Sequence, residues 1–96
     1  MVERILVVKA PLGLHARAAA KLVRLATGFN SNVQLRRVEG ETSADAKSIL
    51  SVLTLAAGRG TRLKVTAEGA DEEVAMNAID GLFADGFGEL ELEPPG

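Results

Sequence analysis

The chain has 96 residues, which is enough for one domain and too few for two. It has no cysteine, which excludes disulfides, thiolate nucleophiles and cysteine-bound zinc together. A net charge of −2 and only 3% aromatic residues argue against nucleic-acid binding, and no apolar run reaches the ~18 residues of a membrane span. We therefore expect a cytoplasmic domain with no nucleic-acid partner and no membrane insertion.

Alternation and helical spacing divide the chain into seven elements. In chain order they are a strand (2–8), a helix (16–27), a strand (32–37), a short strand near Thr42, a helix (47–55), a strand (61–67) and a helix (70–83). The strands are apolar on one face only, so helices should cover one side of the sheet. This predicts an α+β fold, a two-layer sandwich with the order βαββαβα.

The end of the chain has a different pattern. Residues 87–96 alternate Glu and Leu and then reach Pro94 and Pro95. We expect one domain over residues 1–86, followed by a tail that is either a short edge strand or a frayed end.

His15 is the only histidine, and it lies in residues 13–17, Gly-Leu-His-Ala-Arg, where a loop turns into the first predicted helix. Histidine can be both neutral and nucleophilic near pH 7. A helix N-terminus offers free N–H groups and partial positive charge, and Arg17 adds a permanent cation. These features disfavour the protonated ring and favour an anion. We therefore expect His15 to be open to solvent and to carry a phosphoryl group, stabilised by Arg17 and by the backbone N–H groups of Ala16 and Ala18.

Three segments in order carry a resemblance to a known family. They are residues 13–17 with the Ala-rich helix after them, residues 47–55 with the sequence Lys-Ser-Ile-Leu-Ser-Val-Leu-Thr-Leu, and the turn 69–72. Together they resemble HPr, the histidine-containing phosphocarrier of the bacterial sugar phosphotransferase system. The resemblance spans residues 2–84 and implies an open-faced sandwich of four antiparallel strands and three helices.

The resemblance also implies an activity. His15 would accept a phosphoryl group on Nδ1 from enzyme I, which phosphoenolpyruvate charges, and would pass it to sugar-specific carrier proteins. Such a chain is a monomeric phosphoprotein and not an enzyme. Three features depart from the family: Ala18 replaces a usual proline, the stretch between Leu35 and Ser48 is slightly longer, and the tail looks like an addition.

Ser48 has two interpretations that the sequence leaves open. Serine before an apolar helix is a preferred N-cap on local grounds alone. The resemblance implies a regulatory serine as well, modified by a serine kinase and phosphatase. A phosphate there would add negative charge at the helix N-terminus.

The helix over 47–55 carries more apolar side chains than a core-facing stripe needs. We expect some of them to stay exposed and to form a docking surface for partner proteins, an apolar patch with a basic rim. The expected docking residues are Leu14, Lys21, Arg24, Lys47, Leu50 and Leu53.

Two other functions remain open at this point. One keeps the fold and serves a nitrogen-type relay or a regulatory role through Ser48. The other is a regulatory domain that binds a small molecule without covalent chemistry and does not need His15. We expect no metal and no cofactor, because no ligand cluster has metal spacing and residues 58–60 lack the rest of a phosphate-binding glycine motif.

Overall fold

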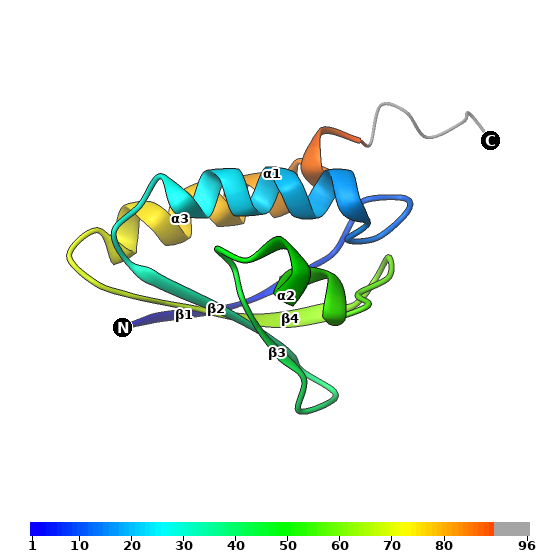
Figure 1. Cartoon of the computed structure of the whole chain (residues 1–96), viewed down its shortest axis with the longest axis horizontal. Helices are drawn as coiled ribbons and strands as arrows, with labels where there is room; N and C mark the ends of the chain where they lie inside the picture. Colours follow the sequence, from blue (N-terminus) through cyan, green and yellow to red (C-terminus); the bar gives the residue numbers. More distant parts are fainter. Residues whose placement is uncertain (90–96) are drawn as a thin grey trace.

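The computed structural model describes residues 1–89 and places three α-helices on one face of a four-stranded sheet (Figure 1). In chain order the elements are β1 (Val2–Val7), α1 (Ala16–Thr27), β2 (Asn32–Arg37), β3 (Ser43–Asp45), α2 (Ile49–Thr54), β4 (Arg62–Glu68), α3 (Glu72–Ala84) and the 3₁₀ helix η1 (Gly86–Gly88). The predicted element order and the α+β class are confirmed. The main differences are that α2 is shorter than expected and that η1 was not expected.

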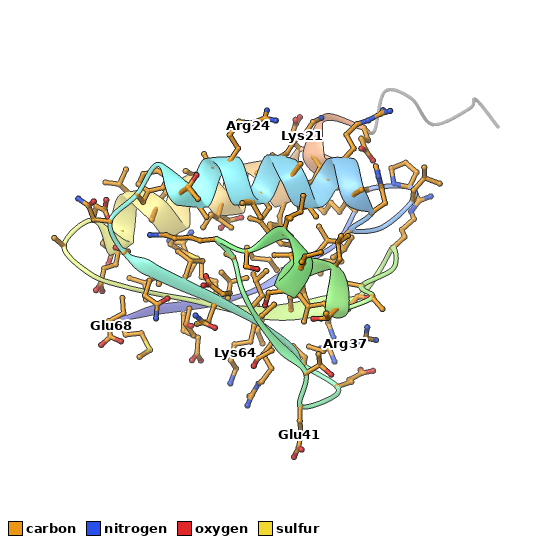
Figure 2. All side chains as sticks on the ribbon, in the orientation of Figure 1. Lys21, Arg24, Arg37, Glu41, Lys64 and Glu68 are labelled. Atoms are coloured by element: carbon orange, nitrogen blue, oxygen red, sulfur yellow. The ribbon has the colours of Figure 1, made fainter. Side chains whose placement is uncertain are left out.

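The sheet has the order β1-β4-β2-β3, and every neighbouring pair is antiparallel. Leu6 lies opposite Leu63, and Leu35 lies opposite Val65. Opposite residues point to the same face of a sheet, so this register brings apolar side chains together under the helices. The other face is mostly polar, with Ile5 and Val7 of β1 as exposed apolar residues, and Figure 2 shows Lys64 pointing away from the helices.

The core lies between the sheet and the helices. The helix α1 contributes mainly alanine to it and packs closely against α2 and α3, whereas α3 contributes larger side chains and lies against β1 and β4. The buried residues of these two helices are Ala18, Ala19, Leu22 and Ala26 from α1 and Ala75, Met76, Ile79 and Phe83 from α3. Within residues 1–89 no helix is both long and apolar enough to cross a bilayer.

The start of the expected tail packs against the domain. Phe87 is fully buried, with its ring centroid 4.9 Å from that of Phe83 at an interplanar angle of 61°. Lys21 Nζ donates a hydrogen bond to the Phe87 carbonyl at 2.6 Å. These residues form neither an edge strand nor a frayed end, because burying the Phe87 ring removes a large apolar surface from water. The rest of the expected tail, 90–96, lies outside the described residues.

Ala56 follows α2 and has a positive φ of 47°. This left-handed conformation strains a residue with a Cβ, and glycine is favoured at this position after a helix. Ala56 is exposed, so little packing is lost on removing its methyl group. Ala56→Gly is therefore expected to raise the free energy of unfolding by about 1 kcal/mol in urea titrations. A lower free energy of unfolding in the variant would contradict this reading of the strain.

Asp71 fixes the loop between α1 and β2. Its carboxylate accepts hydrogen bonds from the backbone N–H groups of Asn30 at 2.8 Å and Ser31 at 2.9 Å, and from the Ser31 hydroxyl. The Ser31 hydroxyl, supported by these amides, holds the pKa of Asp71 below its ordinary value of 3.8. The charged carboxylate therefore stabilises the native state.

The sign of this linkage predicts an acid-dependent loss of stability. A lowered pKa in the native state gives stabilisation that is complete above the ordinary pKa and is lost as the pH falls through the lowered one. The urea midpoint of the wild type is expected to fall more steeply below about pH 4 than that of Asp71→Asn, which cannot titrate there. Equal slopes in the two proteins would show that Asp71 is not a source of the acid sensitivity.

Candidate functional site

His15 is the N-cap of α1, at the junction where the sequence places it. A turn sets it there: Gly13 has a φ of +73°, and the next amide, that of Leu14, donates to the Ala57 carbonyl at 2.8 Å. His15 itself has the extended backbone of an N-cap, with φ −76° and ψ −179°. The imidazole is therefore held at the positive end of the helix dipole.

The Nδ1 atom of His15 accepts a hydrogen bond from the backbone N–H of Arg17, with a distance of 3.2 Å between the two nitrogens. A backbone N–H can only donate, so Nδ1 carries a lone pair and no proton. The bond lies at the long end of the range for N–H donors. The nitrogen at the helix N-terminus is therefore the nucleophilic one.

The other ring nitrogen meets a carboxylate. Both side-chain oxygens of Glu89 lie 2.9 Å from His15 Nε2, and Glu89 is only 4% exposed. A carboxylate can only accept, so Nε2 is the nitrogen that bears the proton. The two contacts together assign a neutral ring with the proton on Nε2 and the lone pair on Nδ1.

His15 is less open than expected. Its side chain is 27% exposed, and Glu89 covers the Nε2 edge of the ring. Sequence reasoning missed Glu89, which lies 74 residues further along the chain. The one sequence signal at Glu89 is its position in the alternating Glu/Leu stretch, and this alternation does not indicate a contact with His15.

The expected phosphate-binding groups lie on the first turn of the same helix. Ala16 and Arg17 are exposed, whereas Ala18, which was also expected to bind phosphate, is fully buried. Within residues 1–89, no acceptor meets the N–H groups of Ala16 and Ala18, as is usual for the first amides of a helix. The Arg17 guanidinium likewise has no ion-pair partner in this part of the chain. The turn thus gathers unpaired donors beside Nδ1.

Leu14 is buried, contrary to the expectation that it lies in an exposed docking surface. It is 5% exposed, because the turn at Gly13 and the bond from the Leu14 amide to Ala57 direct its side chain into the core. Its neighbour Leu12 is exposed instead, at 78%. The sequence did not distinguish these two leucines, since both flank the same glycine.

The other expected docking residues differ in their exposure to solvent. Leu50 is 73% exposed, whereas Leu53 is half-buried and packs against the core. Arg24 is exposed, and Figure 2 shows it on the outer side of α1 near Lys21. Both lysines are half-buried: Lys21 is bonded to the Phe87 carbonyl, and Lys47 Nζ donates to the Phe29 carbonyl at 2.8 Å.

Ser48 is the N-cap of α2. Its hydroxyl oxygen accepts from the Ser51 N–H at 3.3 Å, which confirms the local interpretation. Its modification stays a prediction. Within residues 1–89 no group of three or more metal-ligating side chains gathers.

The fold and the site define a class of protein: a small open-faced sandwich in which a helix-capping histidine presents an unprotonated Nδ1 at a helix N-terminus. The family described as "PTS HPr component phosphorylation site" matches residues 2–85, which include every element of the sheet and the three α-helices.

Relatives agree with this match. Phosphocarrier protein HPr of Cupriavidus necator is 45% identical over 91 residues, which cover 95% of this chain and 100% of the relative. Phosphocarrier protein NPr of Escherichia coli is 45% identical over 78 residues, 81% of this chain and 86% of the relative. The crystal structure of HPr-C-His from Thermoanaerobacter tengcongensis has a TM-score of 0.86 and 37% identity, covering 93% of this chain and 98% of that one.

The chain belongs to the HPr family of phosphocarrier proteins of the phosphotransferase system. It is a carrier and not an enzyme. Membership of this family argues against a domain that only binds a small molecule. Both sugar-type and nitrogen-type carriers are among the relatives.

Proposed function

We propose that this chain is a cytoplasmic carrier that accepts a phosphoryl group on Nδ1 of His15 from enzyme I and passes it to sugar-specific carrier proteins. The observation that carries the proposal is the unprotonated Nδ1 at the N-terminus of α1, which accepts a hydrogen bond from the Arg17 N–H. The exposed Arg17 side chain and the exposed Ala16, whose N–H has no acceptor within residues 1–89, lie on the same turn.

The transfer needs one exchange of hydrogen bonds. The Nδ1 lone pair forms the new bond to phosphorus while the bond from phosphorus to the donor breaks, and the donor keeps that electron pair. The Arg17 N–H leaves Nδ1, a small cost for a 3.2 Å bond, and donates to a phosphoryl oxygen instead. The N–H of Ala16 and the Arg17 guanidinium then stabilise the phosphate charge.

The test is incubation of the protein with phosphoenolpyruvate and enzyme I. The expected result is a mass gain of one phosphate that is lost in acid and maps to the peptide containing His15. A chain that gains no phosphate, or that gains an acid-stable one on another residue, would overturn the proposal.

Arg17→Lys is expected to slow the transfer about tenfold, because lysine keeps the charge but lacks the planar fork of donors that matches phosphate. Rapid-quench measurement of phosphoryl acceptance from phosphorylated enzyme I checks this. Arg36→Lys, on an exposed residue of β2 outside the proposed docking surface, is the matched control. Equal rates in Arg17→Lys and the wild type would remove the guanidinium from the mechanism.

A nitrogen-type relay is the second candidate. The identity to NPr is the same as that to an HPr relative, 45%, although over fewer residues. Comparing kcat/KM for phosphoryl transfer from sugar-type and nitrogen-type enzyme I decides between them. We expect the sugar-type donor to be preferred, and a clear preference for the nitrogen-type donor would reassign the relay.

Partner docking is proposed for the surface around His15. The exposed Leu12 and Leu50 supply apolar area, and Arg17 and Arg24 supply charge for an acidic partner. Ser48 lies at the end of α2 next to Leu50, so a phosphate added there by a serine kinase would introduce negative charge into this surface.

A further inference from the structure

Glu89 is a buried carboxylate with a single partner in the described part of the chain. Both of its oxygens face His15 Nε2 at 2.9 Å, and its side chain is 5% exposed. Burying a carboxylate is costly unless a donor compensates for the lost water. The Nε2–H of His15 is that donor, so the ring and the carboxylate constrain each other.

The segment that contains Glu89 is fixed by core packing and by a hydrogen bond to α1. We call residues 86–89 the C-terminal latch. Phe87 anchors it in the core beside Phe83, and Lys21 of α1 donates to the Phe87 carbonyl at 2.6 Å. The latch therefore lies against α1, and Figure 1 shows it close to the end of the helix where His15 lies. Such anchoring fixes the carboxylate within the small tolerance that a working site needs.

We propose that Glu89 is a positioning residue for phosphoryl transfer, which acts through the Nε2–H of His15. This inference rests on the proposed function of His15. The carboxylate holds the proton on Nε2 and the ring in one orientation, so that Nδ1 is always the nitrogen with the lone pair. It belongs to the reacting unit although it never touches the phosphate.

The charge of Glu89 acts during the step itself. When Nδ1 forms its bond to phosphorus, the ring gains a bond at Nδ1 and keeps its proton on Nε2, so positive charge develops on the ring. A carboxylate 2.9 Å from Nε2 stabilises that charge, and the low exposure of Glu89 strengthens the effect. The proton stays on Nε2 throughout. The phosphorylated ring keeps this charge, so the carboxylate favours acceptance and slows the loss of the phosphoryl group.

Glu89→Gln separates charge from shape. The glutamine carbonyl oxygen can still accept from Nε2–H, so the ring keeps its orientation while the negative charge is removed. We expect the rate of phosphoryl acceptance at saturating donor to fall about tenfold, with the KM for phosphorylated enzyme I nearly unchanged. We also expect the isolated phosphorylated variant to hydrolyse faster, because the positively charged phosphorylated ring is no longer stabilised by the carboxylate and leaves phosphorus more readily.

Two further variants complete the test. Asp85→Asn removes an exposed carboxylate of the same region that does not contact His15, and it should behave like the wild type. Glu89→Leu removes the acceptor as well, and ¹⁵N NMR of the ring should show the loss of the single Nε2–H form that the wild type and Glu89→Gln display. A merely structural role would not shorten the lifetime of the phosphohistidine.

The outcomes are distinct. Wild-type rates and wild-type phosphohistidine lifetimes in Glu89→Gln would overturn the inference while the wild type still accepts phosphate. Failure of the wild type itself to accept phosphate would instead overturn the proposed function.

Discussion

Replacing His15 with alanine is expected to abolish phosphoryl acceptance from enzyme I. The variant has no imidazole at the N-terminus of α1, and His15 is the only histidine in the sequence. It also loses the N-cap bond to the Arg17 N–H and leaves the Glu89 carboxylate buried without a donor. We therefore expect a second effect, a loss of about 2–3 kcal/mol in the free energy of unfolding.

His15→Asn is the matched control for this experiment. Asparagine is a preferred N-cap and its amide can donate, so it replaces part of the hydrogen bonding without a nucleophile. We expect it to be more stable than His15→Ala and equally inactive. The measurements are the acid-labile phosphate per chain and the urea midpoint. Phosphate on either variant would place the acceptor elsewhere in the chain.

Gly13→Ala is expected to reduce the free energy of unfolding by about 2–4 kcal/mol. Gly13 has a φ of +73°, and a Cβ there would lie 2.6 Å from the Ala57 carbonyl oxygen and 2.8 Å from the Gly58 Cα. Both obstacles are backbone atoms, so no side-chain rotation relieves them. The same displacement would move His15, so phosphoryl acceptance should slow as well.

Gly81→Ala on α3 is the control for Gly13→Ala, because it adds the same methyl group at a position with free space. Nothing lies within 4 Å of a Cβ added there, and the residue is exposed in a helix. We expect this variant to gain up to about 1 kcal/mol through helix propensity. Unfolding in urea measures both glycine variants. A Gly13→Ala protein as stable as the wild type would show that the turn before His15 can open without cost.

Much of the fold was predictable because its signals are local. The alternation in β2 and β4 and the alanine spacing in α1 give the element types directly, whereas the strand register comes from the structure. His15 was found for the same reason, since a lone histidine at a loop–helix junction is a pattern of adjacent residues. These features depend on neighbours in the chain.

The errors have a physical cause in common. The direction of the Leu14 side chain depends on a turn that is fixed by a hydrogen bond to Ala57, 43 residues away by the numbering, and no local pattern encodes it. Glu89 belongs to the site only because Phe87 has a place in the core. Residues that are positioned by distant packing cannot be assigned from periodicity, which describes only one element at a time.

The pairing of His15 with Glu89 joins two parts of the chain that are 74 residues apart. The two side chains are in contact only when the sheet is formed and Phe87 is packed in the core. The imidazole resonances are therefore a built-in reporter of global folding: they keep their native positions only while both ends of the described domain are in place. A single histidine makes that signal readable without any label.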